Sequence, residues 1–120
     1  MKSQRQEILQ RRLHLRDRLR QVSREPIMRG SLVERLRKCG RSNCACASDS
    51  KARHGGKFLT VAINGKPEAL HIRPESEAYV RDAIAAYQQL WDLINDLTGC
   101  ELAELRRQVR ERRRMKQRRA

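Results

Sequence analysis

Three cysteines and one histidine lie close together in this chain, and this cluster constrains the fold more than any other feature. Thiolates and imidazoles are the ligands that zinc prefers in a closed tetrahedral site, and the chain offers four of them at Cys39, Cys44, Cys46 and His54. Cys44 and Cys46, two residues apart, would project the same way from an extended segment and could reach one ion. Because four protein ligands leave no position for water, the cluster predicts a structural Zn²⁺ ion.

Other interpretations of the cluster stay open. Its spacing departs from the common C-x₂-C pattern, so a transient disulfide between Cys44 and Cys46, or inert thiols beside an exposed histidine, are alternatives. His71 could replace His54 as the fourth ligand, although it lies in a proposed strand. Cys100 stands alone and is expected to be a structural or exposed thiol.

The chain carries no pattern typical of an enzyme. A cysteine–histidine nucleophile pair is conceivable only if the cluster holds no metal. The sequence has no Gly-rich phosphate loop ending in Lys-Ser/Thr, and its acidic residues are spread along a helix rather than clustered for two metal ions. We therefore expect no catalytic residues.

The charge of the chain points to a polyanionic partner. Its 28 Lys and Arg against 14 Asp and Glu give a net charge of +14, which favours nucleic acid. Most of these residues are arginine, whose planar guanidinium suits phosphate. Three of the four aromatic residues lie in a predicted helix at core positions, so few remain to stack on unpaired bases. Contact with a duplex backbone is therefore expected rather than binding to single strands. DNA is the first expectation, and RNA stays an open alternative.

The predicted contacts with nucleic acid form two groups, for which a merely solvated basic surface is the alternative. One group lies beside the cysteine cluster and the other lies in the C-terminal tail. The first comprises Arg35, Arg37, Lys38 and Arg41, and the second comprises Arg110, Arg112, Arg113, Arg114, Lys116, Arg118 and Arg119.

The pattern of apolar residues predicts an α+β fold in one small domain over residues 1–110. Residues 1–25 indicate a basic amphipathic helix, residues 31–73 a zinc-stapled loop with a two-stranded β-hairpin, and residues 74–98 a long helix. A core with four aromatic residues would be thin, so a metal staple or self-association is expected to support it. The apolar stripe of the first helix comprises Ile8, Leu15, Leu19 and Val22, broadened by Leu9 and Leu13.

The hairpin has a clear turn signal. Asn64-Gly65 is a favoured dipeptide for a two-residue turn, and this turn would place Leu59 opposite Leu70. Pro67 lacks an N–H, so the second strand is expected to be an edge strand. Residues 31–38 fit a short strand or a helical turn equally well.

The long helix is acidic, whereas the first helix is basic. This difference predicts that the two pack against each other, or that they pair across a coiled-coil homodimer. Thr98-Gly99 is predicted to break the helix. A weaker stripe follows to Val109, and residues 110–120 are expected to form a disordered basic tail.

The sequence shows neither a secretory signal nor a stretch of roughly 20 apolar residues that could span a membrane. We expect a cytoplasmic protein without a membrane partner, and an association with the nucleoid if it binds DNA. A reducing compartment favours metal ligands over disulfides.

One motif resembles that of a family of small, uncharacterised, basic bacterial proteins often encoded near transposases. It runs Gly30-Ser31-Leu32, then Cys39-Gly-x-x-x-Cys44-x-Cys46, then His54-Gly55, and the likeness covers about residues 5–110. Where the family has His-Gly-Pro-Tyr, this chain has Gly56 and Lys57 in the last two places, and His71 replaces a usual aromatic residue. The resemblance implies the zinc site and the fold but no biochemical activity. The second expectation rests on the acidic and basic helices, which could form a dimer or dock onto a transposase or recombinase. In this case the protein would be an adapter or dimerising partner that does not touch nucleic acid.

Overall fold

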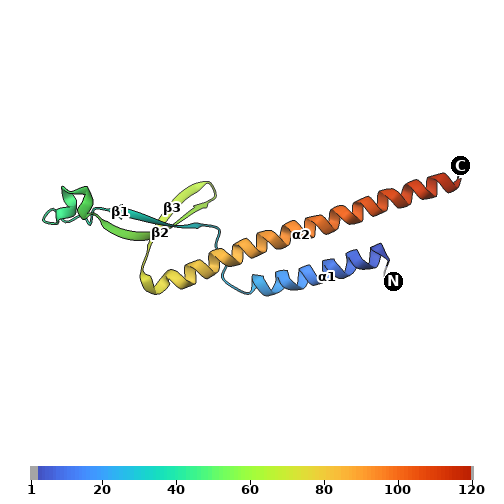
Figure 1. Cartoon of the computed structure of the whole chain (residues 1–120), viewed down its shortest axis with the longest axis horizontal. Coiled ribbons are helices and arrows are strands. Elements are labelled where there is room, and N and C mark those ends of the chain that lie inside the picture. The colour runs from blue at the N-terminus through green and yellow to red at the C-terminus, as the bar shows by residue number, and fades with distance from the viewer. Residues whose placement is uncertain (1–2, 120) are drawn as a thin grey trace. The chain divides into compact units, whose positions relative to one another are not determined.

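The computed structural model describes residues 3–119 and shows the expected α+β fold. Its elements follow the order α1 (Gln4–Ser23), β1 (Ser31–Arg37), β2 (His54–Ile63), β3 (Lys66–Ile72) and α2 (Pro74–Arg119) (Figure 1). Two 3₁₀ helices, η1 (Ala45–Ala47) and η2 (Ser50–Ala52), lie in the loop between β1 and β2. A single domain was expected, but the chain divides into two compact units: Pro26–Tyr87, and α1 with the part of α2 from Gln88 onward. The division is reasonable because each unit buries apolar side chains of its own.

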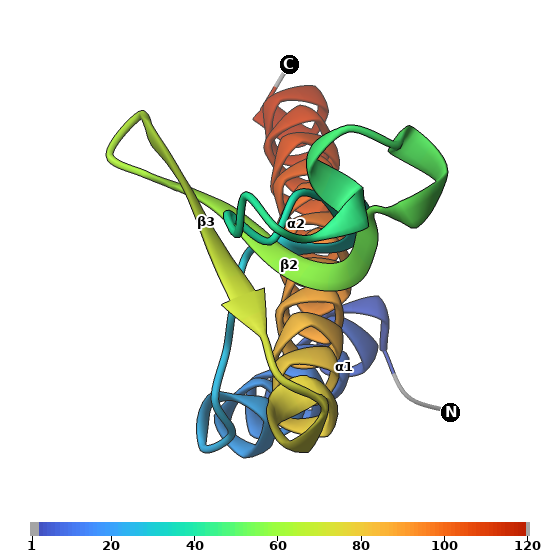
Figure 2. The ribbon, with the colours of Figure 1, turned by 90° about the vertical axis from the view of Figure 1, so that its left-hand side faces the viewer.

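The unit formed by Pro26–Tyr87 is built on a three-stranded antiparallel sheet in the order β1-β2-β3. The ambiguous segment 31–38 contributes the strand β1, so the predicted two-stranded hairpin has a third strand. Asn64 and Gly65 both have positive φ, 52° and 80°, as a two-residue hairpin turn of type I′ requires. Leu59 lies opposite Leu70, as predicted. Pro67 lies in an edge strand, also as predicted (Figure 2).

One face of this sheet packs against the first turns of α2. Leu59 of β2, Ile72 of β3 and Val80 of α2 form the buried cluster. Lys57 and Glu77 add an ion pair between sheet and helix, at 2.5 Å. This core is small, so the sheet has little apolar area with which to stabilise the loop at its end.

The other face of the sheet, called the open face below, carries the alternate residues of each strand. Among the residues that the structure describes, none of its members is buried. Cross-strand pairing aligns Val33, Phe58 and His71 in one row across it. Its charged and aromatic members are Arg35, Arg37, His54, Phe58 and His71.

The other unit is an antiparallel pair of helices. Arg12 pairs with Glu101 at 2.7 Å, and Arg110 donates to Gln4 at 2.9 Å, so α1 and α2 run in opposite directions (Figure 1). The predicted packing of the basic helix against the acidic one is therefore seen within one chain.

The buried stripe of α1 is narrower than predicted. Ile8, Leu15 and Val22 are buried at intervals of seven residues, as in a coiled-coil seam. Leu9 and Leu13, which were expected to broaden the stripe, are exposed. A single neighbouring helix covers only a narrow strip of α1, and this explains the difference. The helix begins at a capping box in which Ser3 and Gln6 exchange hydrogen bonds.

Helix α2 corrects two predictions. It continues through Thr98-Gly99 without a break and extends to Arg119, so the tail is helical as far as the structure describes it. The Thr98 hydroxyl donates to the carbonyl of Ile94 at 2.9 Å, which satisfies it inside the helix. Gly99 weakens a helix by only about 1 kcal/mol, and the adjacent Cys100 is buried. Arginine is a good helix former and suits the C-terminal end of the helix dipole.

In the part of the chain that the structure describes, no helix has the length and apolar character needed to cross a membrane.

Candidate metal centre

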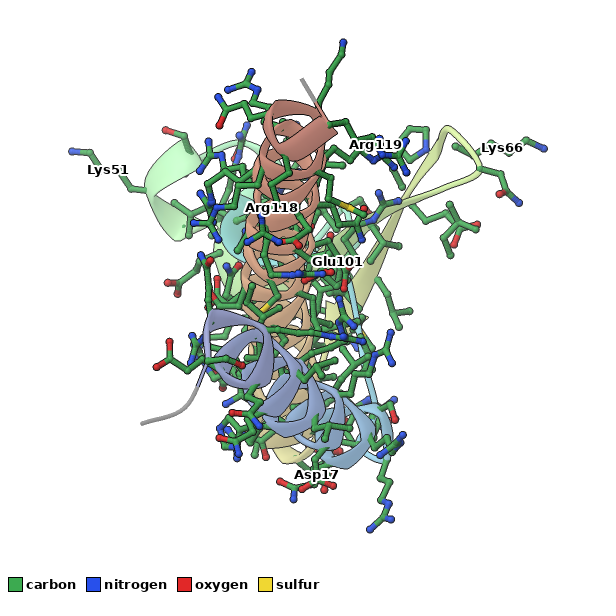
Figure 3. All side chains as sticks on the ribbon, turned by 90° about the vertical axis from the view of Figure 1, so that its right-hand side faces the viewer. Asp17, Lys51, Lys66, Glu101, Arg118 and Arg119 are labelled. Atoms are coloured by element: carbon green, nitrogen blue, oxygen red, sulfur yellow. The ribbon has the colours of Figure 1, made fainter. Side chains whose placement is uncertain are left out.

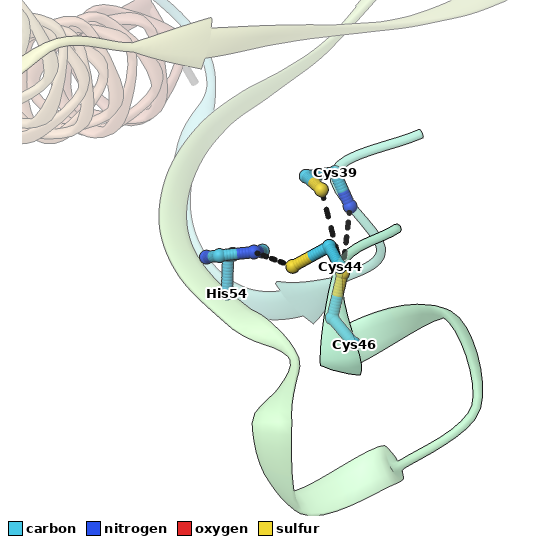
Figure 4. A group of neighbouring side chains, drawn as sticks. All are labelled: Cys39, Cys44, Cys46 and His54. Atoms are coloured by element: carbon cyan, nitrogen blue, oxygen red, sulfur yellow. Dashed lines mark hydrogen bonds between the residues drawn. The ribbon is translucent and has the colours of Figure 1, made fainter. Parts of the chain in front are cut away.

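The four predicted ligands meet at one end of the sheet, where the β1–β2 loop leaves it and returns (Figure 4). Cys39 follows β1 directly, and His54 is the first residue of β2. The strand register pairs His54 with Arg37, so it brings the histidine next to the segment that carries Cys39. Cys44 and Cys46 come from the loop itself.

The loop reaches the centre through two tight turns. Gly40 adopts a φ of 86°, a left-handed conformation that glycine tolerates best. The N–H of Cys44 then donates to the carbonyl of Arg41 at 3.3 Å. Cys46 lies in the 3₁₀ helix η1, so the expected extended segment between Cys44 and Cys46 is wrong, although both thiols still reach the same point. Asp49 caps η2 by accepting the N–H of Lys51 at 2.9 Å.

The ligand atoms have the spacing of a metal site. All four lie within 4.8 Å of one another. The Sγ atoms of Cys39 and Cys46 are 3.5 Å apart, and Cys44 Sγ lies 3.4 Å from His54 Nε2. Around a tetrahedral ion with metal–sulfur bonds of about 2.3 Å, ligand atoms are about 3.8 Å apart. The cluster could therefore hold a metal ion after shifts of about 1 Å or less.

Hydrogen bonds and burial shift the pKa values of Cys44 and Cys46 in opposite directions. The backbone N–H of Cys46, followed by the side chain of His54, lowers the pKa of Cys44 to about 6. At Cys46, the backbone N–H of Cys39 lowers the pKa, but burial and the neighbouring thiols outweigh it and leave the pKa raised. Cys46 is only 1 % exposed. A bound cation would favour the thiolate at every one of these positions.

His71, the alternative fourth ligand, lies outside this cluster. Its ring meets Phe58 edge-on, with 5.2 Å between the ring centroids. The cluster formed by the described residues contains His54 instead. Cys100 belongs to α2 in the other unit, where it is buried.

The predicted basic contacts lie in two places and are all exposed. Arg35 and Arg37 lie on β1, and Lys38 and Arg41 flank Cys39 in the chain. The seven basic residues of the second group lie on the last turns of α2, which ends with Arg118 and Arg119 (Figure 3). The structure therefore places the first group beside the candidate metal centre and the second group on the other unit.

Two residues of the open face, Phe58 and His71, were not predicted as nucleic-acid contacts, and neither was Arg29. The guanidinium of Arg37 lies 5.3 Å from the centroid of the Phe58 ring. Arg29 and Arg35 line a hollow of about 650 Å³ over the strands. The Asn64-Gly65 turn sets the register of the hairpin, and this register pairs Phe58 with His71. The proximity of these two residues could therefore have been predicted from the sequence.

Comparison with known proteins gives a family but no activity. A family model described as a domain of unknown function, DUF6788, matches residues 5–82, which include all four candidate ligands. No curated protein and no solved structure matches the chain. The family match agrees with the resemblance to uncharacterised proteins. A bacterial origin and a link to transposases stay expectations.

Proposed function

The chain belongs to the DUF6788 family, and we propose that it is a nucleic-acid-binding accessory protein whose sheet is held by a structural zinc ion. One observation carries the proposal. The four ligand atoms gather at the end of β1, the strand that presents Arg35 and Arg37. A metal ion at this point would fix the backbone of a basic segment and so position its guanidinium groups.

Zinc is the metal that the donor set favours. Three thiolates and one imidazole in a tetrahedral arrangement are typical of structural zinc sites, which hold no catalytic water. The sheet needs such support because its buried cluster is small. Metal binding contributes directly to folding in small domains of this kind.

Duplex DNA is the proposed partner. A net charge of +14 gives a strong, sequence-independent attraction to phosphate. The arginines beside the metal centre supply one set of contacts, and the exposed last turns of α2 supply another. An association with mobile elements would fit this role, and it rests on the family resemblance alone. We assign no catalytic residue.

The test is the salt dependence of DNA binding, measured by fluorescence anisotropy on a labelled duplex. Each phosphate contact contributes about −0.9 to the slope of log K against log salt concentration. The double substitution Arg35→Ala/Arg37→Ala should therefore reduce the magnitude of the slope by about 2. As the matched control, Lys51→Ala/Lys66→Ala removes the same charge from the same unit, outside the predicted contacts. Equal slopes for both double variants, or no binding by the wild type, would contradict the proposal.

A second candidate function is association through α2, which the exposed apolar side chains of that helix favour. They recur at near-heptad spacing at Trp91, Ile94, Leu102, Leu105 and Val109, each at least 38 % exposed. A second copy of the chain would cover such a stripe in a homodimer. A transposase or recombinase is the other expected occupant. In this adapter role the protein need not contact nucleic acid, so salt-sensitive binding to naked DNA distinguishes the two functions. A monomer by sedimentation at micromolar concentration would exclude the homodimer.

A further inference from the structure

We infer that the open face of the sheet binds an unpaired stretch of nucleic acid, with a base against His71 and the Arg37 guanidinium and with the sugar–phosphate backbone along Arg35 and Arg29. The inference rests on the proposed function and makes it more specific. The preferred ligand becomes a duplex that carries a single-stranded extension. This differs from the expectation based on the number of aromatic residues, which favoured a duplex alone.

Planar groups gather at one point of the open face. Phe58 is half-buried in the central strand, and it contacts both His71 and Arg37. His71 and Arg37 are themselves exposed. Imidazole rings and guanidinium planes are surfaces on which unpaired bases stack, and every base can use them because every base has a π face. Phe58 thus holds two stacking groups in place.

The absence of a side chain at Gly56 makes room for the ring of His71. A Cβ atom on Gly56 would lie 3.1 Å from His71 Nε2, closer than ordinary van der Waals contact. Glycine at this position therefore lets the histidine ring lie against the sheet.

A hollow on the same face continues the site along the strands. Its volume of about 650 Å³ is within the range of small-ligand sites, and its lining includes Arg29, Arg35 and Thr60. One guanidinium nitrogen of Arg29 donates to the carbonyl of Ala62 at 2.9 Å, which fixes the group in place. Its remaining N–H groups can bind phosphate. Glu68 is the one acidic residue in this lining.

Within the unit Pro26–Tyr87, the core lies on the opposite face of the sheet. The open face thus combines two exposed stacking groups, His71 and Arg37, with two further arginines and a hollow on one surface. Positive charge with planar side chains is the combination that binds single strands, in which bases and phosphates are accessible together. A stacked duplex shields its bases and would use the arginines alone.

The experiment compares two labelled DNAs by fluorescence anisotropy at one salt concentration. One is a blunt hairpin duplex, and the other is the same duplex with a single-stranded extension of about ten nucleotides. The wild type should bind the extended DNA about fivefold or more tightly than the blunt DNA, which corresponds to one stacked base. Phe58→Leu and His71→Ala should remove this preference, and His71→Phe should keep it. Tyr79→Leu removes an exposed aromatic side chain from α2 in the same unit and should leave the preference unchanged.

The outcomes separate the inference from the proposed function. Equal, salt-dependent affinity of the wild type for both DNAs would refute the site on the open face and leave DNA binding intact. No binding to either DNA would refute the proposed function itself. A preference that survives His71→Ala would also overturn the inference, because this exposed side chain can be removed without opening the core.

Discussion

Replacing Cys46 by serine should weaken zinc binding strongly. Cys46 is the most buried of the four candidate ligands, and its Sγ accepts the N–H of Cys39 at 3.3 Å. Structural zinc sites with four ligands contribute about 10–16 kcal/mol, so one ligand in four is worth about 2.5–4 kcal/mol. Because about 1.4 kcal/mol corresponds to a factor of ten, the expected loss of zinc affinity is about 100- to 1,000-fold.

The assay is competition for zinc with a chromophoric chelator, followed by circular dichroism of the metal-free and metal-bound forms. Cys100→Ser is the matched control, because Cys100 is also buried but belongs to the other unit and is not one of the four clustered residues. Its zinc affinity should equal that of the wild type. Unchanged affinity in Cys46→Ser would show that this thiol is not a ligand. A wild-type protein that binds no zinc under reducing conditions would refute the metal centre altogether and favour redox or inert cysteines.

Two further predictions concern the helix pair. Leu15→Ala should lower the free energy of unfolding by about 2–5 kcal/mol in urea titrations, because Leu15 is 3 % exposed. The control Leu13→Ala should change it by no more than about 0.5 kcal/mol. Equal effects of the two substitutions would contradict the narrow buried stripe. The Arg107 side chain, followed by that of Gln108, lowers the pKa of Glu104 to about 2 from an ordinary 4.5. The Glu104 carboxylate therefore binds a proton more tightly in the unfolded chain than in the folded one. The stability that this group contributes is lost as the pH falls from about 4.5 to about 2. Glu104→Gln should flatten this part of the stability–pH curve, and an unchanged curve would argue against the interaction.

The candidate ligands could be predicted from the sequence because their chemistry is local. Thiolates and an imidazole close together in a short segment have few structural alternatives in a reducing compartment. The conformation between Cys44 and Cys46 could not be predicted, because a backbone hydrogen bond, from the N–H of Ala47 to the carbonyl of Cys44 at 3.0 Å, closes this short 3₁₀ turn. Which histidine joins the cluster also depends on strand pairing. The register of β1 and β2 places His54, and not His71, beside Arg37 and so near Cys39.

The errors in the fold share a physical cause. Segment 31–38 was ambiguous because its three apolar residues, Leu32, Val33 and Leu36, fit a strand and a helical turn equally well, and its partner strand decides its conformation. Thr98-Gly99 looked like a break because local propensity disfavours helix there, but the burial of Cys100 outweighs that preference. Counting aromatic residues left out His71, which lies beside Phe58 on one face of the sheet. Tertiary context decided each of these points.

If a metal ion binds, the loop between Cys39 and His54 has a consequence for the lifetime of the protein. Arg41, Lys51 and Arg53 all lie between the first and the last candidate ligand, and each is a cleavage site for trypsin-like proteases. A loop held by an ion at both ends resists entry into a protease cleft, because cleavage requires local unfolding of the chain. Removal of the ion would make the peptide bonds after these three residues accessible to the protease at the same time. Degradation of the chain would then follow the supply of metal, and the metal-free protein would be the form that is removed.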